Sequence, residues 1–154
     1  MSNVASVANG EENTCVVMKD GTMKCWGYGY YGQNGDGSTT TTYNPSATTT
    51  ASVTGVIQAA LGYEHTCVVT TAGAVKCVGY NGYGQLGDGT LTNNTSWVTA
   101  ISSGAISVAC GGYHSCALMG NGTVQCWGNN GSGQLGDNGA CGTSCKTPVT
   151  VSGF

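Results

Sequence analysis

The fold is decided by the stretch Cys15-Val16-Val17-Met18-Lys19-Asp20-Gly21-Thr22-Met23-Lys24-Cys25. Two short runs of strand-forming residues flank a turn that ends in glycine, which predicts a hairpin with a three-residue loop and a left-handed last residue. In that register Cys15 lies opposite Cys25. Directly opposed residues have Cα atoms about 4.5–5.5 Å apart, within the reach of a disulfide. The turn and the cysteine spacing therefore predict the same bridged hairpin.

The stretch recurs twice, because Cys67/Cys77 and Cys116/Cys126 have the same spacing and similar glycine turns. The first cysteines of successive pairs are 52 and then 49 residues apart. Each hairpin is followed by a glycine-rich loop: Gly32–Gly37, Gly84–Gly89 and Gly133–Asp137. A period near 50 residues with strand and turn signals is typical of β-propeller blades.

Apolar side chains alternate onto both faces of each hairpin, with the cysteines on one face and Trp26, Val78 or Trp127 on the other. A sheet that is apolar on both faces needs cover on both sides, and stacked blades provide it. A further strand is expected before each hairpin, at 4–8, 56–60 and 105–109. We therefore predict an all-β chain of three antiparallel, propeller-type blades in a single array over 1–154. Blade 1 covers about 4–54, blade 2 about 56–103 and blade 3 about 105–154.

Charge and cysteine content limit the function and the compartment. The net charge is −3, and only four residues are Lys or Arg. No basic stripe exists for nucleic acid, and no polybasic anchor for a membrane surface. No apolar run is long enough to span a bilayer, so no membrane insertion is expected. Nine cysteines in a repeated framework predict an oxidising compartment, extracellular or at the cell surface.

These motifs resemble the regulator of chromosome condensation repeat family. The third unit carries them most fully, as Gly111-Gly-Tyr-His114-Ser-Cys116-Ala-Leu118, Cys126-Trp-Gly128 and Gly133-Gln-Leu-Gly-Asp137. The resemblance implies a propeller, which the family usually closes with about seven blades; three units cannot close a ring alone. The cysteine spacing is similar to that of the bacterial extracellular branch. The nucleotide-exchange activity of chromatin-binding members is not expected here, because basic residues are few and the cysteine framework is of a secreted type.

The units depart from the family pattern at three places. Asn13 stands where the other units have His65 and His114, Val78 replaces a tryptophan, and Asn34 replaces a leucine.

Chemically capable residues favour structural roles. The two histidines recur at one repeat position, so we expect each to hydrogen-bond inside its blade rather than to act as a catalytic base. Asp36, Asp88 and Asp137 supply one carboxylate per loop, which suits turn hydrogen bonding better than calcium. No catalytic residue, metal or cofactor is predicted.

The cysteines outside the hairpins leave alternatives open. Cys141 and Cys145 could join Cys110 or His114 on zinc, but an oxidising compartment favours a local disulfide. Eight cysteines are then paired: Cys15, Cys25, Cys67, Cys77, Cys116, Cys126, Cys141 and Cys145. Cys110 is left as a buried thiol or as an intermolecular disulfide.

Tyrosines cluster after the Cys-Trp-Gly motif, and they either form a binding surface or pack between blades. They are Tyr28, Tyr30, Tyr31, Tyr80 and Tyr83.

The terminal blades show no polar cap, and the low charge gives little repulsion between copies. The sequence therefore predicts a non-enzymatic structural protein that self-associates through its terminal blades, as a closed oligomer or as a filament. The alternative is a protein- or glycan-binding module cut from a larger secreted propeller.

Overall fold

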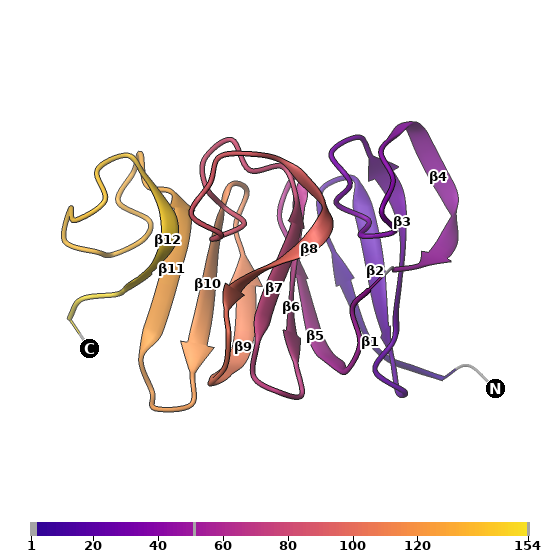
Figure 1. The fold of residues 1–154 in the computed structure, drawn as a ribbon, viewed down its shortest axis with the longest axis horizontal. Coiled ribbons are helices and arrows are strands. Elements are labelled where there is room, and N and C mark those ends of the chain that lie inside the picture. The colour runs from indigo at the N-terminus through magenta and orange to yellow at the C-terminus, as the bar shows by residue number, and fades with distance from the viewer. Residues whose placement is uncertain (1–2, 51, 154) are drawn as a thin grey trace.

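The computed structural model describes residues 3–50 and 52–153, so that Met1, Ser2, Ala51 and Phe154 of the expected array lie outside the described residues. The described chain forms three four-stranded antiparallel sheets, each made from four consecutive strands, which stand side by side (Figure 1). The expected all-β, three-blade architecture is confirmed. The strands are β1 Val4–Asn9, β2 Asn13–Met18, β3 Met23–Gly29, β4 Thr40–Thr49, β5 Val56–Leu61, β6 His65–Thr70, β7 Val75–Gly79, β8 Asn94–Ile101, β9 Ala105–Cys110, β10 His114–Met119, β11 Val124–Asn129 and β12 Ser144–Thr150.

The central hairpins have the register that the sequence predicts. Cys15 pairs with Cys25, and the same pairing holds for Cys67 with Cys77 and for Cys116 with Cys126. The three disulfides have Cα–Cα distances of 4.1, 4.1 and 4.0 Å. The turn glycines have φ of 80°, 73° and 87°, a region that residues with a Cβ rarely enter. Each glycine therefore sets the register that brings its cysteine pair together.

The fourth strand of each sheet was not predicted from sequence. These outer strands, β4, β8 and β12, are rich in threonine, whose branched side chain suits a strand, and they lack a regular apolar alternation. Both prolines of the chain, Pro45 and Pro148, lie in outer strands. A missing amide donor is tolerated there because the outer edge pairs on one side only.

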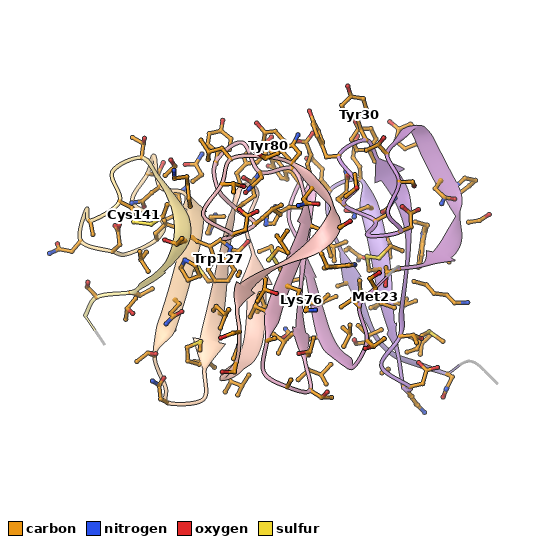
Figure 2. All side chains as sticks on the ribbon, in the orientation of Figure 1. Met23, Tyr30, Lys76, Tyr80, Trp127 and Cys141 are labelled. Atoms are coloured by element: carbon orange, nitrogen blue, oxygen red, sulfur yellow. A yellow bond between two sulfur atoms is a disulfide. The ribbon has the colours of Figure 1, made fainter. Side chains whose placement is uncertain are left out.

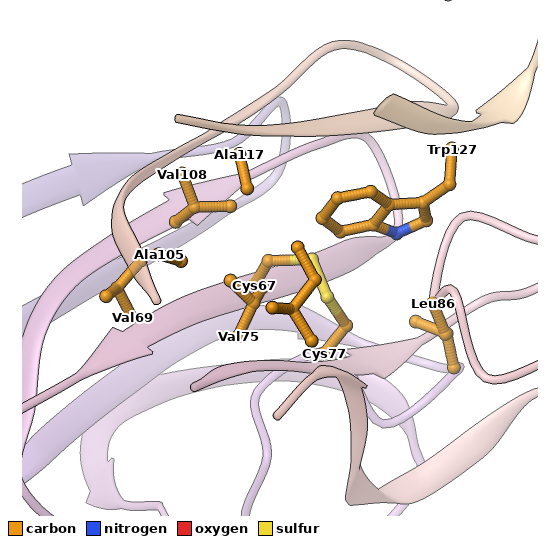
Figure 3. Packing of buried hydrophobic residues seen from close by; sticks show 10 residues of the cluster. Cys67, Val69, Val75, Cys77, Leu86, Ala105, Val108, Ala117 and Trp127 are labelled. Atoms are coloured by element: carbon orange, nitrogen blue, oxygen red, sulfur yellow. A yellow bond between two sulfur atoms is a disulfide. The ribbon is translucent and has the colours of Figure 1, made fainter. Parts of the chain in front are cut away.

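The blades pack face to face, and their first strands, β1, β5 and β9, lie next to one another. We call the face that carries the disulfide the trailing face, because it packs on the following blade. The opposite face is the leading face. Between blades 2 and 3, the disulfide Cys67–Cys77, Val69 and Val75 pack against Val108 and Trp127 in one buried cluster (Figure 3). A second cluster joins blades 1 and 2 in the same way.

Within the part of the chain that is described, no helix is long and apolar enough to cross a membrane.

The three hairpin disulfides close loops of equal length, so their entropic contribution to stability is the same, about 3 kcal/mol in the chain-entropy account. Burial differs, because Cys67 and Cys77 are fully buried while Cys116 is half-buried. We expect Cys67→Ala/Cys77→Ala to lower the free energy of unfolding more than Cys116→Ala/Cys126→Ala. Of these two pairs, only Cys67–Cys77 lies inside a junction, where its removal leaves a cavity. Chemical denaturation of the two variants measures this order, and equal losses would contradict it.

Candidate functional site

A histidine and a serine meet at the junction between blades 2 and 3. Nε2 of His65 lies 2.9 Å from Oγ of Ser115, and Oγ of Ser115 donates to the carbonyl oxygen of Gln85 at 3.0 Å. Because the hydroxyl has one proton and gives it to Gln85, His65 donates from Nε2. His65 was expected to hydrogen-bond inside its own blade; its side chain bonds to the next blade instead.

The His65–Ser115 pair does not have the properties of a catalytic base and nucleophile. Both side chains have no solvent exposure, so a substrate has no access to them. Burial, with a smaller contribution from His114, lowers the pKa of His65 to about 3, which keeps the ring neutral. Its Nδ1 atom has no hydrogen-bond partner among the described residues. The pair is a neutral link between blades.

Cys110 is the free cysteine of the described chain, and its thiol lies beside the same junction. The Sγ atom donates to the carbonyl oxygen of Ala60 at 3.4 Å and lies 3.8 Å from Oγ of Ser115. Burial raises the pKa of the thiol to about 12, so the reactive thiolate is disfavoured. Cys110 as a whole is only half-buried and borders a surface pocket, so the buried thiol and the intermolecular disulfide both stay predictions.

Side chains that could bind a metal come together once among the described residues, where ligand atoms of His65, Cys67 and Cys110 lie within 4.8 Å of one another. The Sγ atom of Cys67 is bonded to Cys77, so it is not a thiolate ligand. Cys141 and Cys145 form a local disulfide across 5.2 Å between Cα atoms.

The loop aspartates make turn hydrogen bonds, as their isolated positions suggested. Asp36 and Asp88 accept from the backbone amides of Ser38 and Thr90, and Asp137 accepts from that of Gly139.

Two buried asparagines, Asn81 and Asn130, hold the glycine-rich loops of blades 2 and 3. Each accepts from the amide of the loop leucine and donates to the loop aspartate, at 3.2 and 3.1 Å. Sequence analysis did not identify them, although both stand seven residues before the aspartate. The first repeat has Gly29 at this position, so only two of the three units carry the signal.

The glycine-rich loops of blades 1 and 2 insert into the following blade. The carbonyl oxygen of Gln85 accepts from the indole Nε1 of Trp127 at 2.8 Å as well as from Ser115. At the first junction, the indole Nε1 of Trp97 donates to the carbonyl oxygen of Gly35 at 3.3 Å. A Cβ atom on Gly84 would stand 2.7 Å from Cα of Lys146, so the loop approaches the next blade too closely for another residue.

The outermost faces of the array are open. Leu118 on the trailing face of blade 3 is 39% exposed, whereas its counterparts Val17 and Val69 are 2% and 0% exposed. On the leading face of blade 1, Val7 is 63% exposed, whereas its counterpart Val108 is 2% exposed. Both end faces therefore present apolar groups that every internal junction buries.

The loop of blade 3 is open in the same way. Gly133, Gln134 and Gly136 are exposed, whereas the corresponding residues of the loops in blades 1 and 2 are buried.

Tyrosines from all three blades meet at the loop end of the array, where Figure 2 labels Tyr30 and Tyr80. The five tyrosines that the sequence singled out are brought together through ring contacts such as Tyr31–Tyr80, with centroids 4.9 Å apart. Three more join them: Tyr43, Tyr63 and Tyr113. The last two come from the loops just before the histidine motif, and sequence analysis did not connect them with the cluster.

We expect stability to depend on the ionisation of His65. Between pH 3 and pH 6.5 the unfolded chain takes up a proton that the folded chain excludes, so the free energy of unfolding rises with pH by up to about 1.4 kcal/mol per unit. His65→Asn, which copies the residue of the first repeat, removes this contribution. Denaturant titrations across this range compare the two proteins, and parallel pH profiles would contradict the assignment.

We expect Trp127→Phe to cost about 1 kcal/mol or more of stability, because it removes a buried hydrogen bond to Gln85. Trp26→Phe is the matched control, since Trp26 has no hydrogen bond from its indole among the described residues and is only half-buried. Denaturation at low protein concentration measures both, and equal losses would show that the Trp127–Gln85 bond is unimportant.

Comparison with known proteins agrees with this geometry. Two sequence signatures described as "Regulator of chromosome condensation (RCC1) repeat" match the chain, one over residues 4–33, 56–85 and 105–134 and the other over 20–69 and 73–118. The chain is 36% identical over 91 residues to the Ultraviolet-B receptor UVR8 of Arabidopsis thaliana, a match that covers 59% of this chain and 21% of the receptor.

Solved structures show the same fold. Prp20p of Saccharomyces cerevisiae, solved in work on its binding to Gsp1p and histones, superposes with a TM-score of 0.86 at 20% identity. This match covers 99% of this chain and 39% of Prp20p. Human WBSCR16 superposes with a TM-score of 0.83 at 27% identity, over 98% of this chain and 38% of that protein. The chain thus spans well under half the length of these relatives.

The repeated hairpins, the inserted glycine loops and these matches lead to one conclusion: the chain belongs to the RCC1 repeat family and forms a three-blade propeller-type module.

Proposed function

We propose that the protein is a non-enzymatic structural subunit of an oxidising, extracellular compartment, and that it assembles with copies of itself. The trailing face of blade 3 packs on the leading face of blade 1 in the next copy. One observation carries this proposal: both end faces expose the apolar positions that internal junctions bury, among them Val7 at one end and Leu118 at the other.

The two end faces complement each other, because each is one half of a junction that the chain already makes twice. In the buried clusters, Val17 and Val69 of a trailing face lie with Ala59 and Val108 of the following leading face. Leu118 stands at the position of Val17 and Val69, on the trailing face of blade 3. Val7 stands at the position of Ala59 and Val108, on the leading face of blade 1. A contact between them would repeat the internal arrangement without any new type of packing.

Polar groups at the two ends match as well. The carbonyl oxygen of Gln85 accepts from Ser115 and Trp127 at the internal junction. On the open loop of blade 3, the carbonyl oxygen of Gln134 is the counterpart of the carbonyl oxygen of Gln85. Thr14 and Trp26, which pair across strands on the leading face of blade 1, provide the corresponding donors. A second copy would thus satisfy the carbonyl group of Gln134 in the same way.

Such a contact is head-to-tail, so it either closes a ring or continues as a filament. The rotation between neighbouring blades decides which, and two copies would supply six blades for a closed ring. A net charge of −3 gives weak repulsion between copies. The disulfide framework supports an oxidising, extracellular setting.

A binding module within a larger propeller is the second candidate. It is supported by the length of the relatives, since the chain covers 39% of Prp20p and 21% of the Arabidopsis receptor. In that arrangement further blades of the same polypeptide would cover the end faces.

The solution mass of the protein, measured by light scattering over a range of concentrations, tests self-association. We expect a dimer or longer species, and Val7→Lys or Leu118→Glu should weaken the association at least about a hundredfold, since an unpaired buried charge costs roughly 3 kcal/mol or more. Ile57→Lys is the matched control, because Ile57 is 51% exposed on the first strand of the central blade, which contributes to neither end face.

Mixing the two charged variants should restore association between them, because the lysine of one then faces the glutamate of the other. A concentration-independent monomer, or equal effects of all three substitutions, would overturn the proposal.

A further inference from the structure

All eight tyrosines of the chain belong to one network of ring contacts at the loop end of the blades. We call this network the tyrosine surface; its members are Tyr28, Tyr30, Tyr31, Tyr43, Tyr63, Tyr80, Tyr83 and Tyr113. Contacts cross both junctions: Tyr31 meets Tyr80 between blades 1 and 2, and Tyr63 meets Tyr113 at 5.2 Å between blades 2 and 3. The surface therefore spans the array and is distinct from the two end faces.

Packing between blades accounts for only part of this surface. Tyr30, Tyr43, Tyr63 and Tyr83 are between 39% and 66% exposed. Within the described residues no tyrosine hydroxyl takes part in a hydrogen bond, so these groups are free to meet a ligand. A neighbouring groove is lined by Tyr30, Tyr31, Thr39, Asn93 and Thr95. The tyrosine surface thus offers aromatic rings and neutral hydrogen-bonding groups on its outer side.

Glu12 and Glu64 lie beside these rings, and Glu11 lies near Glu64. The amide of Tyr28 donates to the carbonyl oxygen of Glu12 at 2.9 Å, and the amide of Tyr80 donates to that of Glu64 at 2.8 Å. The backbone thereby holds Glu12 and Glu64 beside tyrosines. None of these carboxylates forms an ion pair within the described chain.

The electrostatic environment of the tyrosine surface is negative. Burial raises the pKa of Glu64, and the nearby charges of Glu12 and Glu11 raise it further. Burial and then the charge of Glu64 likewise raise the pKa values of Tyr31 and Tyr113. Like charges gathered without a counter-charge cost free energy, and a bound cation would relieve that cost.

We propose that the tyrosine surface binds a positively charged, Arg- or Lys-rich segment of a partner protein. Electron-rich ring faces attract guanidinium and ammonium groups, and adjacent carboxylates add charge-assisted hydrogen bonds. The long apolar stems of these side chains can lie along the exposed rings.

Two other occupants fit less well. A neutral glycan would use the rings and the groove, but it would leave the three glutamates without a counter-charge. A second copy of this chain does not supply a cationic segment, because its four basic residues, Lys19, Lys24, Lys76 and Lys146, are scattered. The partner is therefore a different, basic protein, and this inference is independent of assembly through the end faces.

Fluorescence anisotropy with a labelled (Arg-Gly)5 peptide tests the proposal, with (Glu-Gly)5 and cellohexaose as comparison ligands. The basic peptide should bind, and its affinity should fall as salt screens the carboxylates. Tyr30→Ser or Tyr83→Ser should weaken binding about threefold or more, whereas Tyr30→Phe, which keeps the ring, should not.

Glu64→Gln should weaken binding of the basic peptide, while Asp20→Asn should leave it unchanged. Asp20 is the matched control, because it is an exposed carboxylate in the hairpin turn between β2 and β3. Failure of the peptide to bind would overturn the proposal, as would equal effects of Glu64→Gln and Asp20→Asn. Salt-independent binding of cellohexaose that does not change in Glu64→Gln would also overturn it, in favour of a glycan site.

Discussion

The structure depends on the insertion of the glycine-rich loops of blades 1 and 2 into the following blade. The carbonyl oxygen of Gln85 is the clearest example, because it accepts from both Trp127 and Ser115, residues of the next sheet. The loop comes this close only because glycine stands at position 84. Around this contact, the disulfide of one blade and the tryptophan face of the next exclude water together. A blade therefore buries its trailing face and its glycine-rich loop only when another blade follows it. Contacts at the junctions thus contribute more to stability than contacts inside a single sheet.

The sequence predicted the parts of the fold that local geometry determines. The turn glycine, the cysteine spacing and the alternation of apolar residues set the hairpin register, and all three act within a dozen residues. The outer strand β4 escaped prediction because an edge strand rich in threonine carries no apolar periodicity. The contact of His65 with Ser115 could not be foreseen, since it depends on how blades stack and not on either repeat alone. Asn81 and Tyr113 were missed for a similar reason: their roles depend on loops that meet only in the folded chain.

Two surfaces of different chemistry follow from this architecture. The end faces expose apolar side chains, and each has the shape of half a junction, which suits them to another blade. The tyrosine surface lies across the loops, where no blade can stack, and it combines exposed rings with carboxylates that have no counter-charge. Membership of the RCC1 repeat family gives the scaffold, but fold does not determine function. In this chain the candidate functions belong to the two end faces, which no internal junction covers, and to the tyrosine surface, which the loops expose.

Amide hydrogen exchange in the three glycine-rich loops tests the central claim most directly. The loops share the same internal hydrogen bonds, from Gly35 to Gly32, from Gly87 to Gly84 and from Gly136 to Gly133, so differences in exchange report coverage by a following blade. In dilute solution the amide of Gly136 should exchange much faster than those of Gly35 and Gly87. As the concentration rises it should slow towards their rate. Equal exchange in all three loops, or a Gly136 rate that ignores concentration, would contradict the account.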